Sequence, residues 1–398
     1  MRTKKWISTT LAFMLTASTL SAMEHALTTS DIRSFPLQKG HIGVRASYNR
    51  INNDIDIFDI KQQELGSTVK FGTIGDATGL DLSLAYGATE FYSLFYNYER
   101  LNLHYIDSIL HNNKNELYLK VNIYQNPMHF FETFSADIGY VRNSAADLDI
   151  KNRDRLNSMI QKVNPIPGLS IDGPEIKYKN SSIVFLDPKT NKAVSPFVRI
   201  GDLSDNALYL RFLTGMHYET NIFDLYAGLK YTKINTEISI EPHDNKTLQN
   251  ILNAKGYESV DLGRNEKTFF LGFNYTVEFG SFIFDANYEY LTIWGRDADV
   301  KKTQDNHIIN SALSYIVNKN LLIFVGGKLM LHQFNGVIPY LYNKYTKNKY
   351  TKKYGYARVG LVYNFDTAKL FRNDNDTDYS YGSGYGVSSS ECVTTGCY

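Results

Sequence analysis

The sequence predicts an all-β fold, a closed antiparallel transmembrane β-barrel of about 12 strands. Three observations support this prediction. Apolar and polar residues alternate in many segments, which is the side-chain period of a β-strand. The connections between these segments are short and long in turn, as in a barrel that crosses a bilayer repeatedly. The 398 residues include 30 Tyr, 23 Phe and 27 Gly but only 9 Pro, and aromatic side chains favour strands.

The amino terminus has the pattern of a secretory signal peptide. Three basic residues precede an apolar segment at 6–20, and small residues follow up to Ala22. We predict cleavage near Ala22, which removes residues 1–22 and leaves residues 23–39 as a periplasmic N-terminal segment. A membrane anchor is the weaker alternative, because several Ser and Thr residues interrupt the apolar segment and it is shorter than the about 20 residues that span a bilayer.

The barrel is predicted to occupy residues 40–365. In the segment 271–278, for example, Leu, Phe, Tyr and Val alternate with Gly, Asn, Thr and Glu. Strands are predicted at residues 40–50, 80–88, 91–101, 115–125, 130–142, 206–218, 222–237, 266–279, 282–294, 305–317, 321–332 and 354–365. An even number places both ends of the barrel on one side of the membrane. Two further segments, 67–73 and 194–203, leave open an alternative of 14 strands.

The last predicted strand, residues 354–365, has the clearest pattern. Its outward face is apolar and ends in Tyr363 and Phe365. Its inward face carries Arg358 and Gly360 among other polar residues. The strand resembles the closing strand of Gram-negative bacterial outer-membrane β-barrels, porin-like proteins among them. This resemblance implies a bacterial outer-membrane location, and it implies that Tyr363 and Phe365 form the signal read by the barrel-assembly machinery.

The connections support this orientation. Short turns are predicted near residues 88–90, 125–129, 219–221, 279–281 and 318–320. Long polar connections are predicted at residues 102–115, 143–206, 238–265, 295–305 and 332–353. Outer-membrane barrels place short turns in the periplasm and long loops outside. Two loop segments, 152–163 and 244–255, have helical periodicity and are predicted as short helices, which could fold back as a constriction or lid, or pack as a cap over the mouth.

A secreted soluble β-sandwich is the runner-up fold, since its strands also alternate. A sandwich buries its apolar rows, however, and has no reason to place Gly, Asn and charged residues opposite them in nearly every strand. A helical membrane protein is excluded, because no later run is long and apolar enough to form a membrane helix.

The inward rows of the predicted strands carry both signs of charge. A strongly ion-selective pore would be expected to line its constriction with one sign, whereas a mixed interior allows ion-pair networks that can fill a narrow lumen. Each residue is therefore a candidate for solute contact or for pairing inside the wall. The lumen-lining candidates are Arg45, Asp81, Glu99, Lys120, Asp137, Arg211, Asp224, Lys230, Glu278, Asp285, Glu289, Lys328 and Arg358.

Beyond Phe365 the alternation stops. Residues 366–398 are polar and of low complexity, and we predict a flexible periplasmic tail. Cys392 and Cys397, the only two cysteines, could form a small disulfide ring in an oxidising compartment. Such a ring would constrain only the tail.

The sequence gives little support for a catalytic function. His307 and Ser311 share one strand face but lie two alternations apart, too far for direct proton transfer. Zinc-ligand spacing, a nucleotide loop and a nucleophile elbow are absent from the sequence, so we predict no enzyme activity, no metal and no cofactor. A formal net charge of +1 gives no reason to expect nucleic acid as a partner.

The resemblance implies a porin-like channel for the passive or gated passage of small polar solutes. The alternative is a surface structural or adhesive barrel that acts through its long extracellular loops, and an outer-membrane hydrolase is a third, less favoured reading. The expected partners are outer-membrane lipid, the barrel-assembly machinery and small polar solutes. The sequence does not predict the oligomeric state or the solute.

Overall fold

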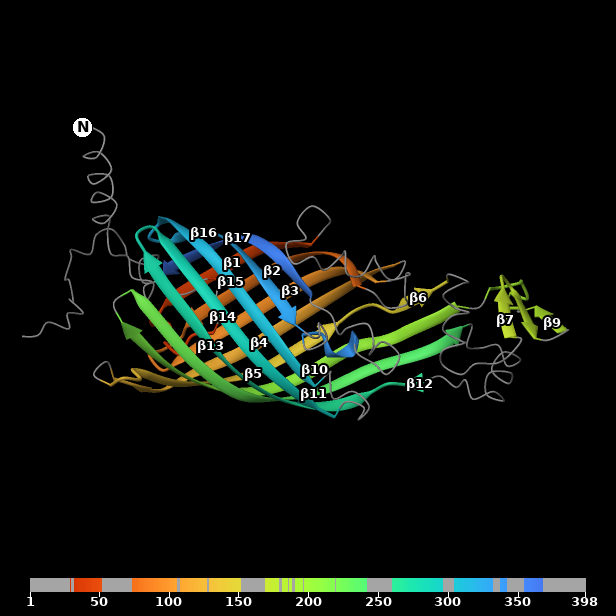
Figure 1. Cartoon of the computed structure of the whole chain (residues 1–398), viewed down its shortest axis with the longest axis horizontal. Coiled ribbons are helices and arrows are strands. Elements are labelled where there is room, and N and C mark those ends of the chain that lie inside the picture. Colours follow the sequence, from red (N-terminus) through yellow and green to blue (C-terminus); the bar gives the residue numbers. More distant parts are fainter. Residues whose placement is uncertain are drawn as a thin grey trace, which may run out of the picture.

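Twelve long strands form the barrel in the computed structural model (Figure 1). The structure describes residues 29, 32–51, 74–105, 108–126, 129–151, 169–178, 181–184, 186–187, 190–195, 197–218, 220–241, 260–295, 304–331, 337–341 and 354–367. The barrel strands are β1 (His41–Ile51), β2 (Ile74–Gly87), β3 (Tyr92–Tyr105), β4 (Ser108–Gln125), β5 (Thr133–Ser144), β10 (Phe197–Tyr218), β11 (Asn221–Glu241), β13 (Arg264–Phe279), β14 (Phe282–Trp294), β15 (Asp305–Asn318), β16 (Leu321–Leu331) and β17 (Tyr354–Asp366).

The sheet closes on itself. Among the described residues, every barrel strand pairs with an antiparallel neighbour on both sides, including β5 with β10 and β10 with β11. The first and last strands complete the wall, with partners from His41↔Asp366 to Arg50↔Ala357. Backbone N–H and C=O groups in hydrocarbon must find partners within the protein, and a closed barrel provides them. The predicted closed antiparallel barrel of 12 strands is confirmed.

The two faces of the wall differ as the alternation predicts. Outer residues such as Leu271, Phe273 and Tyr363 are 41, 39 and 44% exposed. Inner residues of the same strands, such as Asn274 and Asn364, are buried. A lipid bilayer accommodates an apolar outer band, and this arrangement excludes the soluble sandwich, which would bury these rows.

Most predicted connections are found. Short turns join β2 to β3, β4 to β5, β10 to β11, β13 to β14 and β15 to β16, as predicted. The predicted long connection at 102–115 is wrong, because β3 continues to Tyr105 and β4 begins at Ser108. The segment 194–203 is not an additional strand, since most of it forms the start of β10. The segment 67–73 lies outside the described residues.

The strands extend further than predicted because the polarity of the two faces inverts beyond the bilayer. Near the long-loop end, the inner residues Leu101, Leu103 and Leu110 are almost fully buried. Their outward neighbours Asn102 and His111 are polar and partly or fully exposed. Outward polar and inward apolar residues of this kind suit a wall that stands in water, although Ile109 is also exposed and Asn112 buried here. A polar stretch that resembles a loop is therefore a continued strand.

Shorter elements lie beyond the barrel. The strand β6 (Leu148–Ile150) pairs with β10, and the strand β12 (Val260–Asp261) pairs with β11. The strands β7 (Leu169–Asp172), β8 (Glu175–Tyr178) and β9 (Ser181–Val184) form a separate sheet. Figure 1 shows β10 and β11 running past the other barrel strands towards β7 and β9.

Helix is scarce in the described part of the chain, where the 3-10 helix η4 occupies Pro339–Leu341. No helix within the described residues has the length and apolar character needed to cross a membrane. The predicted loop helices at 152–163 and 244–255 lie outside the described residues, as do the predicted signal peptide and the tail from residue 368 onward.

The lipid-facing position of Leu271 can be tested by inserting a charge. Leu271→Arg is expected to lower the free energy of unfolding by about 2–4 kcal/mol, because a cation on the lipid face loses its hydration near the bilayer midplane. Reversible urea unfolding in lipid vesicles measures this change. Ser170→Arg, on the exposed surface of β7, is the matched control and is expected to change stability by about 0.5 kcal/mol or less. Equal effects at both positions would contradict the assigned outer face.

Candidate functional site in the barrel lumen

The structure places every charged residue predicted for the lumen on the inner face of the wall. Those that line the larger of two cavities are Arg45, Asp81, Glu99, Arg211, Asp285, Glu289, Lys328 and Arg358. Lys230 lines the second cavity. The remaining residues, which are buried, are Lys120, Asp137, Asp224 and Glu278. The roles of these residues towards a solute stay predictions.

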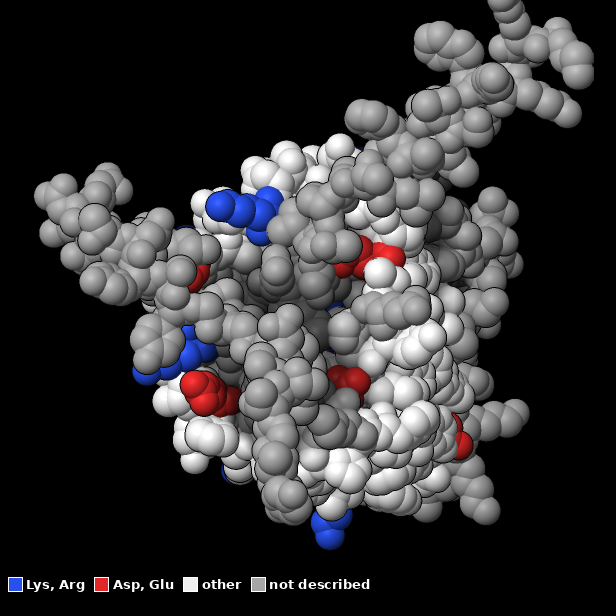
Figure 2. All heavy atoms as spheres, turned by 90° about the vertical axis from the view of Figure 1, so that its left-hand side faces the viewer, with Lys and Arg blue, Asp and Glu red and all other residues white. Residues whose placement is uncertain are grey.

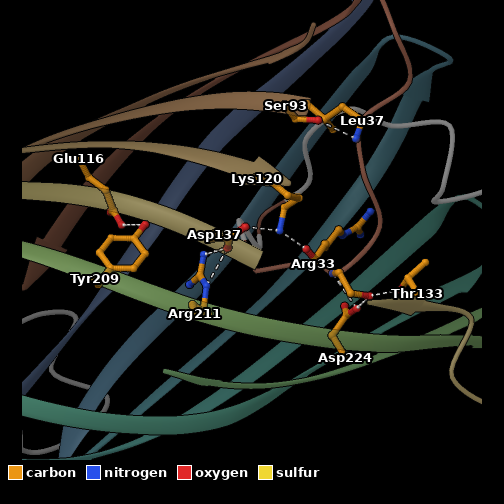
Figure 3. Close-up of polar contacts among 11 residues, drawn as sticks. Arg33, Leu37, Ser93, Glu116, Lys120, Thr133, Asp137, Tyr209, Arg211 and Asp224 are labelled. Atoms are coloured by element: carbon orange, nitrogen blue, oxygen red, sulfur yellow. Dashed lines mark hydrogen bonds and ion pairs between the residues drawn. The ribbon is translucent and has the colours of Figure 1, made fainter. Parts of the chain in front are cut away.

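Asp137 is the centre of a buried ion network (Figure 3). Its carboxylate accepts from Lys120 Nζ at 2.8 Å and from an Arg211 guanidinium nitrogen at 2.5 Å. Both cations are direct cross-strand partners of Asp137, from β4 and β10 respectively. The Arg211 guanidinium also lies over the rings of Tyr118 and Tyr209, at 5.6 and 5.7 Å from their centroids. Because Asp137 is fully buried and pairs with both cations at short range, its carboxylate is the closest counter-charge in the network.

The chain before β1 lies inside the short-turn end of the barrel. We call residue 29 and residues 32–38 the N-terminal plug. Ser34 donates to Asp224 Oδ1 through its backbone N–H at 2.9 Å and its hydroxyl at 2.5 Å, and its Oγ lies 2.6 Å from Thr133 Oγ1. The Leu37 N–H donates to Ser93 Oγ at 3.2 Å (Figure 3). The plug is thereby held by β3, β5 and β11.

The deep end of the plug reaches the opposite wall. The Thr29 carbonyl accepts from Arg45 at 3.2 Å and from Arg358 at 3.3 Å, on the adjacent strands β1 and β17. The Thr29 hydroxyl donates to Asp285 on β14. The Arg33 guanidinium lies 3.9 Å from the same carboxylate. Since these contacts come from well-separated strands, the plug crosses the lumen from wall to wall.

Two glycines shape the wall around the plug. A Cβ on Gly215 would clash with Ser34 Oγ and would come within 3.3 Å of Phe35. A Cβ on Gly87 would clash with the Gln38 carbonyl and lie 3.2 Å from Leu37 Cβ. The wall therefore lacks side chains at two points where the plug approaches closely. The sequence predicts a periplasmic segment here and gives no sign that it enters the lumen.

A second segment closes the long-loop end. We call residues 337–341 the loop cap. The Tyr340 hydroxyl donates to Asn112 Oδ1 at 2.7 Å, and its backbone N–H lies 3.4 Å from Asp205 Oδ2. The Pro339 carbonyl accepts from Arg264 at 3.0 Å. Burial, together with the nearby Asp205 carboxylate, raises the pKa of Tyr340 well above its usual range, so the phenol remains a neutral donor.

The loop cap is packed among apolar side chains of the upper wall. Ile338 and Leu341 join the same buried cluster as Leu103, Ile200 and Ile234. The segments predicted to fold into the barrel were 152–163 and 244–255, which lie outside the described residues. The signal for the loop cap is in the sequence nevertheless, because an apolar run with a proline, residues 337–341, interrupts an otherwise polar connection.

A polar chamber lies between the plug and the loop cap. A cavity of about 240 Å³ is lined by Thr29 and Ile32 of the plug, and a cavity of about 150 Å³ by Val337 and Pro339 of the loop cap. Both cavities are lined by Lys114, Glu116, Arg211, Glu289, Ile308 and Lys328. The two cavities therefore adjoin and form one chamber along the barrel axis, with the plug at one end and the loop cap at the other.

The short-turn end has no strong field of one sign. Figure 2 looks onto this end, and the described acidic and basic side chains lie scattered around its rim. Such a rim gives little electrostatic steering to anions over cations.

Several inner charges escaped the sequence analysis. Glu116 has the same strand parity as Lys120, so a complete count of the alternation finds it. Lys114, which lies 3.0 Å from Glu116, was assigned to a loop because the predicted strand began at residue 115. Asp205 lies just before the predicted start of its strand at 206. Strand alternation could not predict that Arg33 lies in the lumen, because Arg33 belongs to the plug and not to a strand.

The other predicted sites are placed as follows. Tyr363 and Phe365 lie on the outer face of β17 with their rings 5.9 Å apart. Cys392 and Cys397 lie outside the described residues. His307 lies on the outer face of β15 with Nδ1 2.8 Å from the Tyr288 hydroxyl. Within the described part of the chain, no group of three or more His, Cys, Asp and Glu could hold a metal ion.

Comparison with solved structures finds membrane barrels at low identity. The translocator domain of the autotransporter NalP from Neisseria meningitidis is 9% identical, with 82% of this chain and 89% of that chain covered and a TM-score of 0.43. Outer membrane phospholipase A from Escherichia coli is 12% identical, with coverages of 83 and 97% and a TM-score of 0.31. The toluene transporter TodX from P. putida is 9% identical, with coverages of 82 and 89% and a TM-score of 0.34.

No protein-family model matches the chain, and no curated protein matches it. The class follows from the molecule itself, through its closed antiparallel wall, its apolar outer face and its polar lumen. The chain has the fold of an outer-membrane β-barrel.

The buried network makes a prediction about stability. Asp137→Ala is expected to lower the free energy of unfolding by about 3–5 kcal/mol, because it leaves two buried cations without their shared carboxylate. Lys120→Met is expected to cost less than half as much, since Arg211 still neutralises Asp137. Urea unfolding of the refolded barrel measures both changes. A smaller loss for Asp137→Ala than for Lys120→Met would contradict the assigned centre.

The fit between wall and plug makes a second prediction. Gly215→Val is expected to displace Ser34 and to raise hydrogen exchange of the amides in residues 32–38 by about tenfold or more, since each tenfold corresponds to about 1.4 kcal/mol of lost protection. Ala227→Val, on the outer face of β11, is the control and is expected to leave these amides unchanged. Unaltered exchange in Gly215→Val would show that the plug does not rest on this glycine.

Proposed function

We propose that the protein is a gated porin-like channel for small polar solutes. The single observation that carries the proposal is the polar chamber held between two inward-folded segments, the N-terminal plug and the loop cap. A barrel that served only as a rigid anchor would need neither a water-sized cavity nor separate closures at its two ends. A channel with a closed resting state needs both.

The two closures differ in how much apolar surface they bury, which suggests which of them moves. The plug places Leu37 in the buried apolar cluster, with Ile32 and Phe35 packed against it, and is also held by hydrogen bonds and a long ion pair, which water can replace at modest net cost. The loop cap is held by hydrogen bonds and places three residues, Ile338, Tyr340 and Leu341, in the same cluster. Removal of the cap would expose apolar surface to water. We therefore assign the gate to the plug.

The balance of charge supports passage of polar solutes over selection of one ion. The larger cavity is lined by equal numbers of cationic and anionic side chains, among them Arg45, Lys328, Asp81 and Glu289. A pore selective for one sign of ion would concentrate the opposite sign at its constriction. Low ion selectivity is the expected property of this lumen.

The proposal extends to partners and to activity. The apolar outer face supports outer-membrane lipid as the surrounding partner, and the Tyr363 and Phe365 pair supports recognition of β17 by the barrel-assembly machinery. We assign no enzymatic activity, because His307 is engaged with Tyr288 and, among the described residues, no histidine lines either cavity as a base.

A surface adhesive role is the second candidate. The extension of β10 and β11 and the separate sheet of β7, β8 and β9 favour it, because they carry strand structure well beyond the length that spans a bilayer. Planar-bilayer recording separates the two candidates. Discrete conductance steps that change in Arg211→Gln favour the channel, whereas a silent bilayer together with loop-dependent cell binding favours the adhesin.

A disulfide lock tests the gate directly. Ser34→Cys with Thr133→Cys, in a background where Cys392 and Cys397 are Ser, joins plug to wall at a point where the native oxygens are 2.6 Å apart. The oxidised protein is expected to open about tenfold less often in planar bilayers than the reduced protein, because the bond holds the closed population. The Ser34→Cys single variant is the control, and its opening frequency is expected to be the same with and without reductant. Equal opening of the locked and reduced forms would contradict a mobile plug.

A further inference from the structure

The lumen charges fall into two groups. Some neutralise one another within the wall or at the plug, as in Lys114 with Glu116 at 3.0 Å and Arg33 with Asp285 at 3.9 Å. Among the described residues, Lys230, Glu289 and Lys328 form no ion pair within 4 Å, although all three line the chamber. The Tyr226 hydroxyl is a hydrogen-bond partner of Glu289. Charges without an ion partner are costly inside a protein unless hydrogen bonds, water or a ligand meet them.

The order of the strands separates the signs. Lys328, Arg358 and Arg45 lie on the consecutive strands β16, β17 and β1, and together form a cationic sector. On one side, β15 contributes the uncharged Ile308 and Asn310 to the cavity, and Glu289 follows on β14. On the other side, Asp81 and Glu99 follow on β2 and β3. The cationic sector therefore lies between two anionic flanks.

The spacing suits a small dipolar solute. Lys328 on β16 and Glu289 on β14 lie on strands separated by β15, with backbones roughly 10 Å from each other. Their side chains form no ion pair within 4 Å, and an extended dipeptide of about 7 Å places opposite charges near both. The cavity of about 240 Å³ has room for a solute on the order of ten non-hydrogen atoms.

We propose that the chamber binds zwitterionic solutes of amino-acid to dipeptide size, with the carboxylate at Lys328 and the ammonium at Glu289. This inference rests on the proposed channel function and names its substrate class. A dianion is repelled by the carboxylates on both flanks, and a dication is repelled by the cationic sector. A neutral sugar gains neither charge-assisted hydrogen bond, so the chamber favours a solute that carries both signs.

Solute uptake by proteoliposomes tests the substrate class with the full-length protein. Swelling rates are compared in iso-osmotic glycylglycine and in arabinose, a neutral solute of similar size. Glycylglycine is expected to enter several-fold faster. Glu289→Gln and Lys328→Met are each expected to lower the ratio of the two rates to about one, because each removes one charge-assisted hydrogen bond to the zwitterion.

Matched controls keep the outcome specific. Lys267→Met on the outer face and Glu90→Gln in a short turn remove the same charges away from the chamber and are expected to leave the ratio unchanged. Each variant is first checked for the heat-dependent electrophoretic shift of a folded barrel, and calorimetric titration of glycylglycine onto the detergent-solubilised protein gives a second readout.

The possible results are distinct. If arabinose enters as fast as glycylglycine, or if the ratio is unchanged in both chamber variants, the substrate class is wrong while the channel stands. If neither solute enters, the channel function fails and the substrate class fails with it. Binding of glycylglycine that weakens about tenfold in Lys328→Met supports the inference independently of flux.

Discussion

The need to satisfy every backbone hydrogen bond in hydrocarbon governs this structure. No water reaches the lipid-facing side of a barrel wall inside a bilayer, so the N–H and C=O groups of each strand must pair with a neighbouring strand. The pairing of β1 with β17 meets this need by joining the two ends of the sheet. Once the wall is closed, alternate side chains must face lipid or lumen. The exposed Leu, Phe and Tyr rows and the polar interior both follow from that closure.

A closed wall leaves an interior that must be filled or hydrated. Near the short turns it is filled by the plug, which meets the wall at Asp224, Ser93 and the bare surface of Gly215. Near the long loops it is filled by the loop cap and an apolar cluster. Part of the buried charge is neutralised within the wall, for example where Asp137 pairs with Lys120 and Arg211, while Lys230, Glu289 and Lys328 face the chamber. The chamber is thus the part of the lumen that neither closure occupies.

Strand periodicity was sufficient to predict the wall, including the inward position of residues as far apart as Arg45 and Lys328. It failed where the environment changed along a strand, as at residues 102–115, because the outer face there meets water and the inner face packs against apolar side chains. The plug and the loop cap could not be derived from periodicity, since they belong to no strand and their positions depend on contacts between distant segments. The apolar run at 337–341 was visible, but its place inside the barrel was not.

The central claim is that two segments of the chain enclose a polar chamber within a lipid-facing barrel. The most direct measurement is the reaction rate of Asn97→Cys, a chamber-lining position, with a membrane-impermeant thiol reagent in vesicles, with Cys392 and Cys397 replaced by Ser. Thr89→Cys, in an exposed short turn, gives the rate of an open site. The account predicts that Asn97→Cys reacts far more slowly than Thr89→Cys when reagent is present on both sides of the membrane. Equal rates would mean that the lumen is open, and would contradict the enclosed chamber.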